Sequence, residues 1–263
     1  MSITSNSPRT TLLSATEPAA FEIVNPEGKN NLVLVCDHAS NRVPEYLAEL
    51  GLSAAQLADH IGWDPGAAAV ARLLAKNLDA PLLLSGYSRL VIDCNRPLAS
   101  NELIPEQSAG IIIPGNQHLS PQQREQRIQE LFIPYHNAID ELLDARLLSN
   151  PQQPAIFLSI HSFTPFLFNQ QRPWHIGVSH KSDDHFAKHL HSGLVQQGDI
   201  VVGFNQPYAI EDEFDYSIPT HGEARNLPSA MLEIRQDGLI TETGIERWAE
   251  RIAQAYGTYA PNL

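Results

Sequence analysis

The chain has 263 residues, of which 43% are hydrophobic and 18% are charged. This length and composition fit one globular α/β domain and exclude a disordered chain. Lys and Arg total 17 against 30 Asp and Glu, so the formal net charge is −13. This charge excludes nucleic acid and anionic membrane as main partners, although one or two buried arginines can still bind a small anionic substrate.

The cysteine content and the N-terminal segment favour a cytoplasmic protein. Only Cys36 and Cys94 are present, which excludes a disulfide framework and favours a reducing compartment. No run of about 18 apolar residues and no signal-like segment is found. Residues 1–20 are rich in Ser, Thr and Pro and are expected to form a loosely held arm, with 21–263 as a single domain.

The first half of the domain shows apolar runs separated by helix signals. Residues 31–37, 81–85 and 89–94 are predicted to be strands, because each is a short and continuous apolar run. Ser53 and Gln56 form a capping box that begins a helix.

A longer helix is predicted from Ser120, because Pro121 and Gln123 occupy its first and third positions. Pro134 is expected to kink or divide this helix. The second half adds a helix over 183–197, a final helix capped by Thr243 and Glu246, and strands at 155–160, 175–179, 199–203 and 230–234. Continuously apolar strands with helices between them predict a mostly parallel sheet covered on both faces.

Two long stretches without clear periodicity, 97–119 and 204–228, are expected to be functional loops. The second contains Glu211, Asp212, Glu213 and Asp215, which predict a solvated acidic flap.

Side chains that can bind a metal ion or a substrate lie at the ends of four of the predicted strands or directly after them. These side chains are His38 and Asn41, Asn95 and Arg96, His161 and Ser162, and Glu233 and Arg235. Ligands bind at the carboxyl edge of open parallel sheets, so residues distant in sequence are expected to meet there.

Two neutral imidazoles, a carboxylate and a water are the ligands of a catalytic zinc ion, and the sequence leaves the choice of carboxylate open. Asn41 stands where an HxxE pattern would place a carboxylate, but its amide is a poor ligand. Asp37 adjoins His38 and is expected to point to the opposite face. Asp64 is the better candidate, with helix capping ahead of Pro65 as the alternative.

Several motifs, in their order along the chain, resemble the N-formylglutamate amidohydrolase family. They are Asp37-His38-Ala39-Ser40-Asn41 with Pro44, Trp63-Asp64, Asp93-Cys94-Asn95-Arg96-Pro97, Pro134-Tyr135-His136, Ser159-Ile160-His161-Ser162-Phe163, Asn205-Gln206-Pro207-Tyr208 and Leu232-Glu233-Ile234-Arg235. Around the first histidine, Cys36-Asp37-His38-Ala39-Ser40-Asn41 departs from the family's usual Ser-Pro-His-Ser-Gly, which indicates a divergent branch.

The resemblance implies a three-layer α/β/α fold similar to zinc carboxypeptidases, and hydrolysis of the amide of a small anionic N-acyl amino acid. It implies one divalent metal ion, zinc first and manganese or iron as alternatives, bound by His38, Asp64 and His161. Glu233 would be the general base, and Arg96 would bind the substrate carboxylate or the oxyanion. Further substrate contacts are assigned to Asn41, Asn95, Ser162, Tyr208, His221 and Arg235.

Some of these residues have a second interpretation. Arg235 fits an ion pair near Glu233 equally well, and His221 fits an exposed loop histidine. His136 is expected to be a packing histidine. Two other functions stay open: a non-catalytic binding module for acidic amino acids, and a metal-free amidase that uses Cys94 or Cys36 as its nucleophile.

Overall fold

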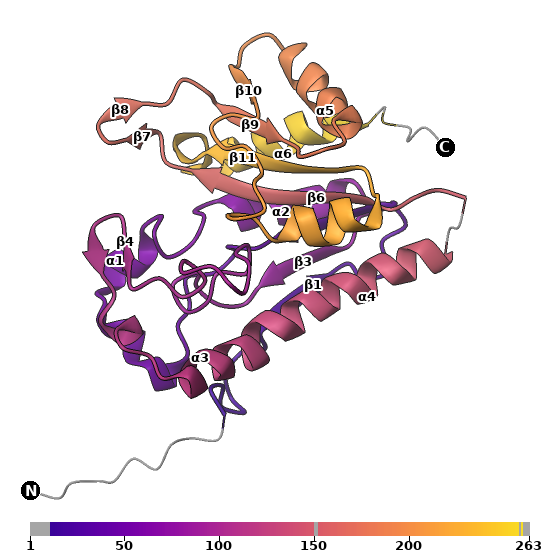
Figure 1. Cartoon of the computed structure of the whole chain (residues 1–263). Helices are drawn as coiled ribbons and strands as arrows, with labels where there is room; N and C mark the ends of the chain where they lie inside the picture. Colours follow the sequence, from indigo (N-terminus) through magenta and orange to yellow (C-terminus); the bar gives the residue numbers. More distant parts are fainter. Residues whose placement is uncertain (1–10, 150–151, 258, 260–263) are drawn as a thin grey trace, which may run out of the picture.

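The computed structural model describes residues 11–149, 152–257 and 259, which fold around a mixed seven-stranded sheet (Figure 1). The strand order is β1-β3-β2-β6-β11-β9-β10. All neighbours are parallel except β1 with β3 and β11 with β9, which confirms a mostly parallel sheet. The bounds are β1 Phe21–Val24, β2 Leu32–Cys36, β3 Leu82–Ser85, β6 Ile156–Phe163, β9 Ile176–Ser179, β10 Val202–Phe204 and β11 Ser229–Arg235.

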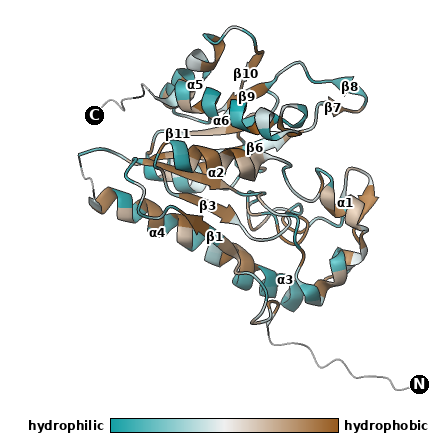
Figure 2. Ribbon diagram, turned by 180° about the vertical axis from the view of Figure 1, so that it is seen from behind, coloured by the Kyte–Doolittle hydropathy of each residue, from teal (hydrophilic) through white to brown (hydrophobic). Residues whose placement is uncertain are grey.

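Helices cover both faces of the sheet, which confirms the three-layer α/β/α arrangement. One face packs on α2 (Ala67–Asn77), α5 (His185–Val195) and α6 (Glu242–Tyr256), and the other packs on α4 (Ile133–Ser149) and the π-helical turn η4 (Ile218–Gly222). Figure 2 shows the hydrophobic residues along β3 and β11 between these layers.

Side chains alternate along β6, so its polar residues Ser159 and His161 lie on the same face of the sheet. Leu158 and Ile160 pack on the α2 side, whereas Phe157 packs on the α4 side. Residues two apart in a strand share a face, so Ser159 and His161 also point to the α4 side.

The predicted strand at 89–94 is wrong, because this segment forms buried turns instead of pairing with the sheet. Its carbonyl groups are satisfied by side chains: Leu90 O accepts from Asn116 Nδ2 at 2.8 Å, and Val91 O accepts from Arg127 Nη1 at 2.9 Å. A buried loop is tolerated when its backbone groups are hydrogen-bonded in this way. The apolar run therefore marks burial and not strand pairing.

Of the three predicted helix starts, those at Ser53 and Ser120 are confirmed. Complete capping boxes at Ser53 and Ser120 begin α1 (Ala54–Ala58) and α3 (Pro121–Arg127). The long helix divides ahead of Pro134 as expected, with a π-helical turn η3 (Ile128–Phe132) between α3 and α4. The capping box at Thr243 is wrong, because Thr241 caps α6 and accepts from the backbone N–H of Gly244 at 3.1 Å.

Residues 11–20 of the expected N-terminal arm pack against the domain, while residues 1–10 lie outside the described residues. The side chain of Leu12 is buried, and its backbone N–H donates to the carboxylate of Glu130 at 2.7 Å. These contacts attach the segment to the turn between α3 and α4.

Short elements form the connections. The hairpin of β4 (Gln107–Ser108) with β5 (Ile111–Ile112) and that of β7 (Phe166–Leu167) with β8 (Gln170–Gln171) project from the same side of the molecule in Figure 1. Among the described residues no helix is long and apolar enough to cross a bilayer. The remaining bounds are η1 Glu45–Gly51, η2 Pro114–Asn116, η5 Glu223–Arg225 and η6 Gln236–Leu239.

Candidate metal centre and active site

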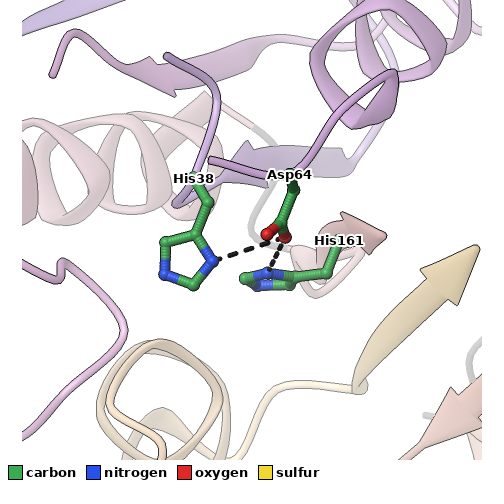
Figure 3. Close-up of side chains that lie close together, drawn as sticks. All are labelled: His38, Asp64 and His161. Carbon is green, nitrogen blue, oxygen red and sulfur yellow. Dashed lines mark hydrogen bonds and ion pairs between the residues drawn. The ribbon is translucent and has the colours of Figure 1, made fainter. Parts of the chain in front are cut away.

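Three side chains from different parts of the sequence meet near the carboxyl ends of β2 and β6. Asp64 Oδ2 lies 2.9 Å from His161 Nδ1 and 3.3 Å from His38 Nδ1, and the dashed lines in Figure 3 mark these two contacts. All three residues are buried, and one ligand atom from each lies within 4.8 Å of the other two. The structure thus brings together the three residues predicted as metal ligands.

The turn before α2 directs the Asp64 carboxylate toward the histidines. The backbone N–H of Asp64 donates to His38 O at 3.0 Å, which ties this turn to the end of β2. Gly66, and not Asp64, is the N-cap of α2, and its φ of 83° is a left-handed conformation that favours glycine. A Cβ at Gly66 would also lie 2.5 Å from the Cβ of Leu239. The capping interpretation of Asp64 is therefore wrong.

Two more carboxylates hold the far nitrogens of the same imidazoles. His161 Nε2 lies 3.1 Å from Asp37 Oδ2, and His38 Nε2 lies 2.7 Å from Asp93 Oδ1. Carboxylates in this position keep the proton on Nε2 and leave Nδ1 available as a metal ligand. Asp37 thus lies behind a candidate ligand and away from Asp64, and Asp93 had no predicted role.

Hydrogen bonds and charges keep Asp37 ionised despite its burial. Burial opposes ionisation, but a hydrogen bond from His161 and the charges of both imidazoles hold the pKa of Asp37 below the usual range. The carboxylate also accepts hydrogen bonds from the hydroxyls of Tyr135, Ser159 and Ser217. Asp37 is therefore a fixed negative charge at the back of the site.

Asp64 and Asp93 are kept ionised by cationic neighbours. Burial opposes ionisation of both groups, yet the pKa of each lies below the usual range. The two imidazoles lower the pKa of Asp64, and Arg89 together with His38 lowers that of Asp93. An ionised Asp64 is the form that binds a metal ion.

Glu233 lies beside His161 on the neighbouring strand. The two residues are aligned in the parallel pairing of β11 with β6, so their side chains emerge on the same face. Glu233 is buried, and its Oε2 has no hydrogen-bond partner among the described residues. Burial raises the pKa of Glu233 to about 7, which suits a group that exchanges protons near neutral pH.

A cavity of about 610 Å³ opens onto these residues and contains several of the predicted substrate contacts. Asn95, Arg96, Ser162 and Tyr208 line it together with Glu233. Arg96 bonds Glu102 through Nε and the carbonyls of Asn95 and Phe214 through Nη1, while Nη2 has no hydrogen-bond partner among the described residues. Nη2 can therefore take a substrate oxygen.

Asn95 and Ser162 use their polar atoms within the protein. Asn95 Nδ2 donates to Asp215 at 3.0 Å, and Asn95 Oδ1 accepts from the backbone N–H groups of Tyr216 and Ser217. The hydroxyl of Ser162 donates to Pro65 O at 3.0 Å. Both residues shape the cavity wall, and Asn95 does so by fixing the loop that contains Asp215.

Two of the predicted substrate contacts lie away from the cavity. Asn41 lies beside a separate hollow lined by Arg42 and Tyr87. His221 is neither an exposed loop histidine nor a cavity residue, because it is buried behind the site against Asp140. The structure does not bring these two residues to the site, because Asn41 lies beside another hollow and the His221 ring, in η4, is directed at His136 and Asp140.

Arg235 likewise lies outside the cavity lining and does not pair with Glu233. Its Nε donates to Asp237 at 2.9 Å, and its Nη1 donates to Arg172 O at 2.8 Å. Arg235 thus fixes the backbone at the end of the β7–β8 hairpin.

Two cavity residues were not predicted in their observed roles. Arg89 lines the cavity and binds Asp93 at 2.8 Å and Asp64 at 3.4 Å, but its position inside an apolar run led to a strand assignment. Asp215 is buried at the cavity wall, which corrects the prediction of a wholly solvated acidic flap. Its acidic neighbours Glu211, Asp212 and Glu213 are exposed.

The arrangement fits a divalent metal ion. A tetrahedral zinc ion with ligands at about 2.0–2.1 Å holds its ligand atoms about 3.3 Å apart, which matches the separations of 2.9 and 3.3 Å around Asp64. The donor set of two imidazoles and a carboxylate also suits zinc. A cation there would offset the negative charge of the buried Asp37, Asp64, Asp93 and Glu233.

Fold and site together define a class: an α/β/α protein with a buried His-Asp-His group and an adjacent carboxylate at the carboxyl edge of its sheet. The family model described as N-formylglutamate amidohydrolase matches residues 30–240. The chain belongs to the N-formylglutamate amidohydrolase family.

Two solved structures resemble the chain over almost its whole length. The gene product Atu2144 from Agrobacterium tumefaciens is 33% identical, with a TM-score of 0.87 over 94% of this chain and 98% of that one. The N-formylglutamate amidohydrolase from Ralstonia eutropha JMP134 is 18% identical, with a TM-score of 0.71 over 90% of this chain and 96% of that one. The second likeness bears on the fold alone. No curated protein matches the chain.

Proposed function

We propose that this protein is a metal-dependent amidohydrolase that cleaves the amide bond of a small N-acyl amino acid. The observation that supports it most is the position of Glu233, whose unpartnered Oε2 lies in the cavity wall beside His161. A binding site alone has no need of a buried carboxylate with a pKa near 7 next to a metal site.

His38, Asp64 and His161 would hold the ion, for which zinc is our proposal. When bound, a divalent ion supplies Lewis acidity toward the substrate carbonyl and the attacking water. Glu233 takes the proton of this water as it attacks the carbonyl carbon, and then delivers the proton to the departing amine nitrogen. Such acid–base catalysis contributes roughly 10²–10⁴-fold to the rate.

Two arginines give the cavity the positive charge that an anionic substrate needs. Arg96 would bind the substrate carboxylate through Nη2, since its other donors bind Glu102 and the carbonyls of Asn95 and Phe214. Arg89 is held by Asp93 and Asp64, so its guanidinium stays beside the site of the reacting carbonyl and can stabilise the oxyanion there.

The cysteine amidase is the weaker alternative. Burial raises the pKa of both Cys36 and Cys94, which disfavours the reactive thiolate. Neither cysteine lines the cavity.

The test combines metal analysis with an activity assay on protein purified without a metal-affinity tag. We expect about one equivalent of zinc, and hydrolysis of N-formyl and N-acetyl amino acids that a chelator abolishes and added zinc restores. The variant His185→Ala is a control, because it removes a ligand from the exposed cluster of Asp183, Asp184 and His185 and should leave activity unchanged. Binding without turnover in the zinc-loaded protein would instead support a non-catalytic module.

A further inference from the structure

The β7–β8 hairpin places large apolar side chains at the mouth of the cavity. Phe166, Leu167 and Phe168 are 56%, 46% and 92% exposed, which is unusual for three consecutive large apolar residues. Of these three, Leu167 also lines the cavity that contains His161 and Glu233. In Figure 1 the hairpin projects beyond the end of β6.

Buried contacts fix the base of this hairpin against the cavity wall. The guanidinium of Arg172 lies 4.8 Å from the centre of the Phe163 ring and 4.7 Å from that of Tyr208. The backbone N–H of Arg172 donates to Pro165 O at 2.9 Å, and Arg235 donates to Arg172 O. The location of Leu167 beside the cavity is therefore held by the buried base of the hairpin.

The loop after β10 contributes further apolar surface to the same cavity. Tyr208 and Phe214 line it, yet they are 41% and 42% exposed. Leu167, Tyr208 and Phe214 thus leave apolar surface in contact with water. A volume of about 610 Å³ lies in the range of cavities that hold drug-sized ligands, and an N-formyl amino acid with a small side chain would leave much of it unfilled.

We propose that the substrate carries a bulky apolar group, which packs on Leu167, Tyr208 and Phe214 while its amide bond lies at the metal site. This inference rests on the proposed function and names its substrate class. The apolar group is either the amino-acid side chain or an extended acyl chain, since both offer the same chemistry to these three residues. Burial of a group the size of a leucine or phenylalanine side chain should raise kcat/KM by roughly ten- to hundredfold.

A substrate panel tests the preference and identifies its source. We would measure kcat/KM for N-formylglycine, N-formylglutamate, N-formylleucine, N-formylphenylalanine and N-hexanoylglycine. Higher values for the leucine and phenylalanine compounds assign the apolar surface to the side chain, and a higher value for the hexanoyl compound assigns it to the acyl chain. The inference is overturned if kcat/KM is the same for the apolar compounds and N-formylglycine. It is also overturned if kcat/KM is highest for N-formylglutamate.

Matched hairpin variants locate the contact. Leu167→Ser should lower kcat/KM for the preferred apolar compound by roughly five- to tenfold and change that for N-formylglycine by less than about twofold. Phe168→Ser is the control, because Phe168 is more exposed but does not line the cavity. Phe214→Ser tests the opposite wall with an independent residue. The assignment is contradicted if Leu167→Ser and Phe168→Ser lower kcat/KM for the apolar compound equally. It is also contradicted if either Leu167→Ser or Phe214→Ser leaves this kcat/KM unchanged.

Calorimetric binding of the same compounds to zinc-loaded Glu233→Gln separates this inference from the proposed function. Preferential binding of apolar compounds without turnover by the wild-type protein supports the apolar site and rejects the hydrolase. Turnover without any apolar preference supports the hydrolase and rejects the apolar site. Neither binding nor turnover of any compound rejects both.

Discussion

Two buried histidine pairs on the same side of the sheet differ in how their ring nitrogens are used. In the site, His38 and His161 each bind a carboxylate through Nε2 and face Asp64 through Nδ1. Behind it, His136 Nδ1 lies 2.8 Å from His221 Nε2, so this pair binds itself. Both pairs are buried, and only the first lines the cavity.

The two rings of the second pair bind each other and share no carboxylate. His136 Nε2 lies 3.0 Å from Cys94 O, and His221 Nδ1 lies 2.9 Å from Asp140. Burial and the charge of His221 lower the pKa of His136 to about 3, whereas Asp37 and Asp64 overcome burial and raise that of His161. A buried histidine pair can bind a metal ion where both rings direct a nitrogen at one carboxylate beside a cavity, and burial alone does not distinguish the two cases.

The largest effect should come from the loss of one ring in each pair. We expect His161→Ala to lose the bound metal and all measurable turnover, because two of three ligands cannot hold the ion in place. His221→Ala should keep about one equivalent of metal, although it costs roughly 1–3 kcal/mol of unfolding free energy because His136 Nδ1 loses its partner, while Asp140 keeps its contact with Arg225. Elemental analysis of the folded variants measures the metal content, and urea denaturation measures the unfolding free energy. Equal metal content in the two variants would make the site assignment wrong.

Glu233 should give the next largest effect, with a different signature. Glu233→Gln keeps the shape of the side chain but cannot accept the water proton, so kcat should fall by roughly 10²–10⁴-fold while the metal stays bound. Glu223→Gln is a control for the same chemical change, since Glu223 binds the backbone N–H of Ser182 outside the cavity. Turnover of Glu233→Gln within about tenfold of the wild type would remove the general-base role.

A smaller effect is expected from the carboxylates that hold the far ring nitrogens. Asp93→Asn leaves the ligands intact but weakens the orientation of His38, and such changes reduce metal affinity by roughly 10–100-fold. Asp140→Asn is the matched change in the other histidine pair and should leave metal affinity unchanged. Competition with a chromophoric chelator measures the metal affinity of each variant. Similar affinities in Asp93→Asn and the wild type would show that His38 needs no such partner.

The layers of the fold and the centre of the site could be predicted from the sequence, because both depend on local patterns. Short apolar runs specified β2, β3, β6 and β11, and the polar residues at their ends specified His38, His161 and Glu233. Asp64 was the best of three candidates for the third ligand, and the structure brings its carboxylate to the two histidines.

The assignments that failed depend on tertiary contacts of individual side chains, which no periodicity encodes. Arg89 and Asp93 reach the site because Asn116 and Arg127 donate to backbone carbonyls of the buried loop that contains them. An apolar run of the same composition would also fit a strand. His221 and Arg235 have suitable chemistry, but their hydrogen bonds are to Asp140 and Asp237. Neither of these partners belongs to a recognisable sequence pattern, so only the folded chain reveals them.

The smallest effect concerns stability, and it tests the second histidine pair alone. Hydrogen bonds and charges from His221 and Arg225 lower the pKa of Asp140 against the opposing effect of burial. A lowered pKa means that ionised Asp140 stabilises the fold above the pKa of the unfolded chain, and that this contribution is lost as the pH falls below about 4. Asp140 is 42% exposed, so solvent screening limits the contribution to about 0.5–1 kcal/mol.

We therefore expect Asp140→Asn to lower the Tm by roughly 1–3 °C at about pH 7, and by progressively less at about pH 4 and pH 3. Asp144→Asn is the control, because Asp144 is 61% exposed and binds Arg225 without contacting His221. Its effect should be smaller at every pH. If the two variants behave alike, the stabilisation comes from Arg225, and the His136–His221 pair does not depend on Asp140 for its stability.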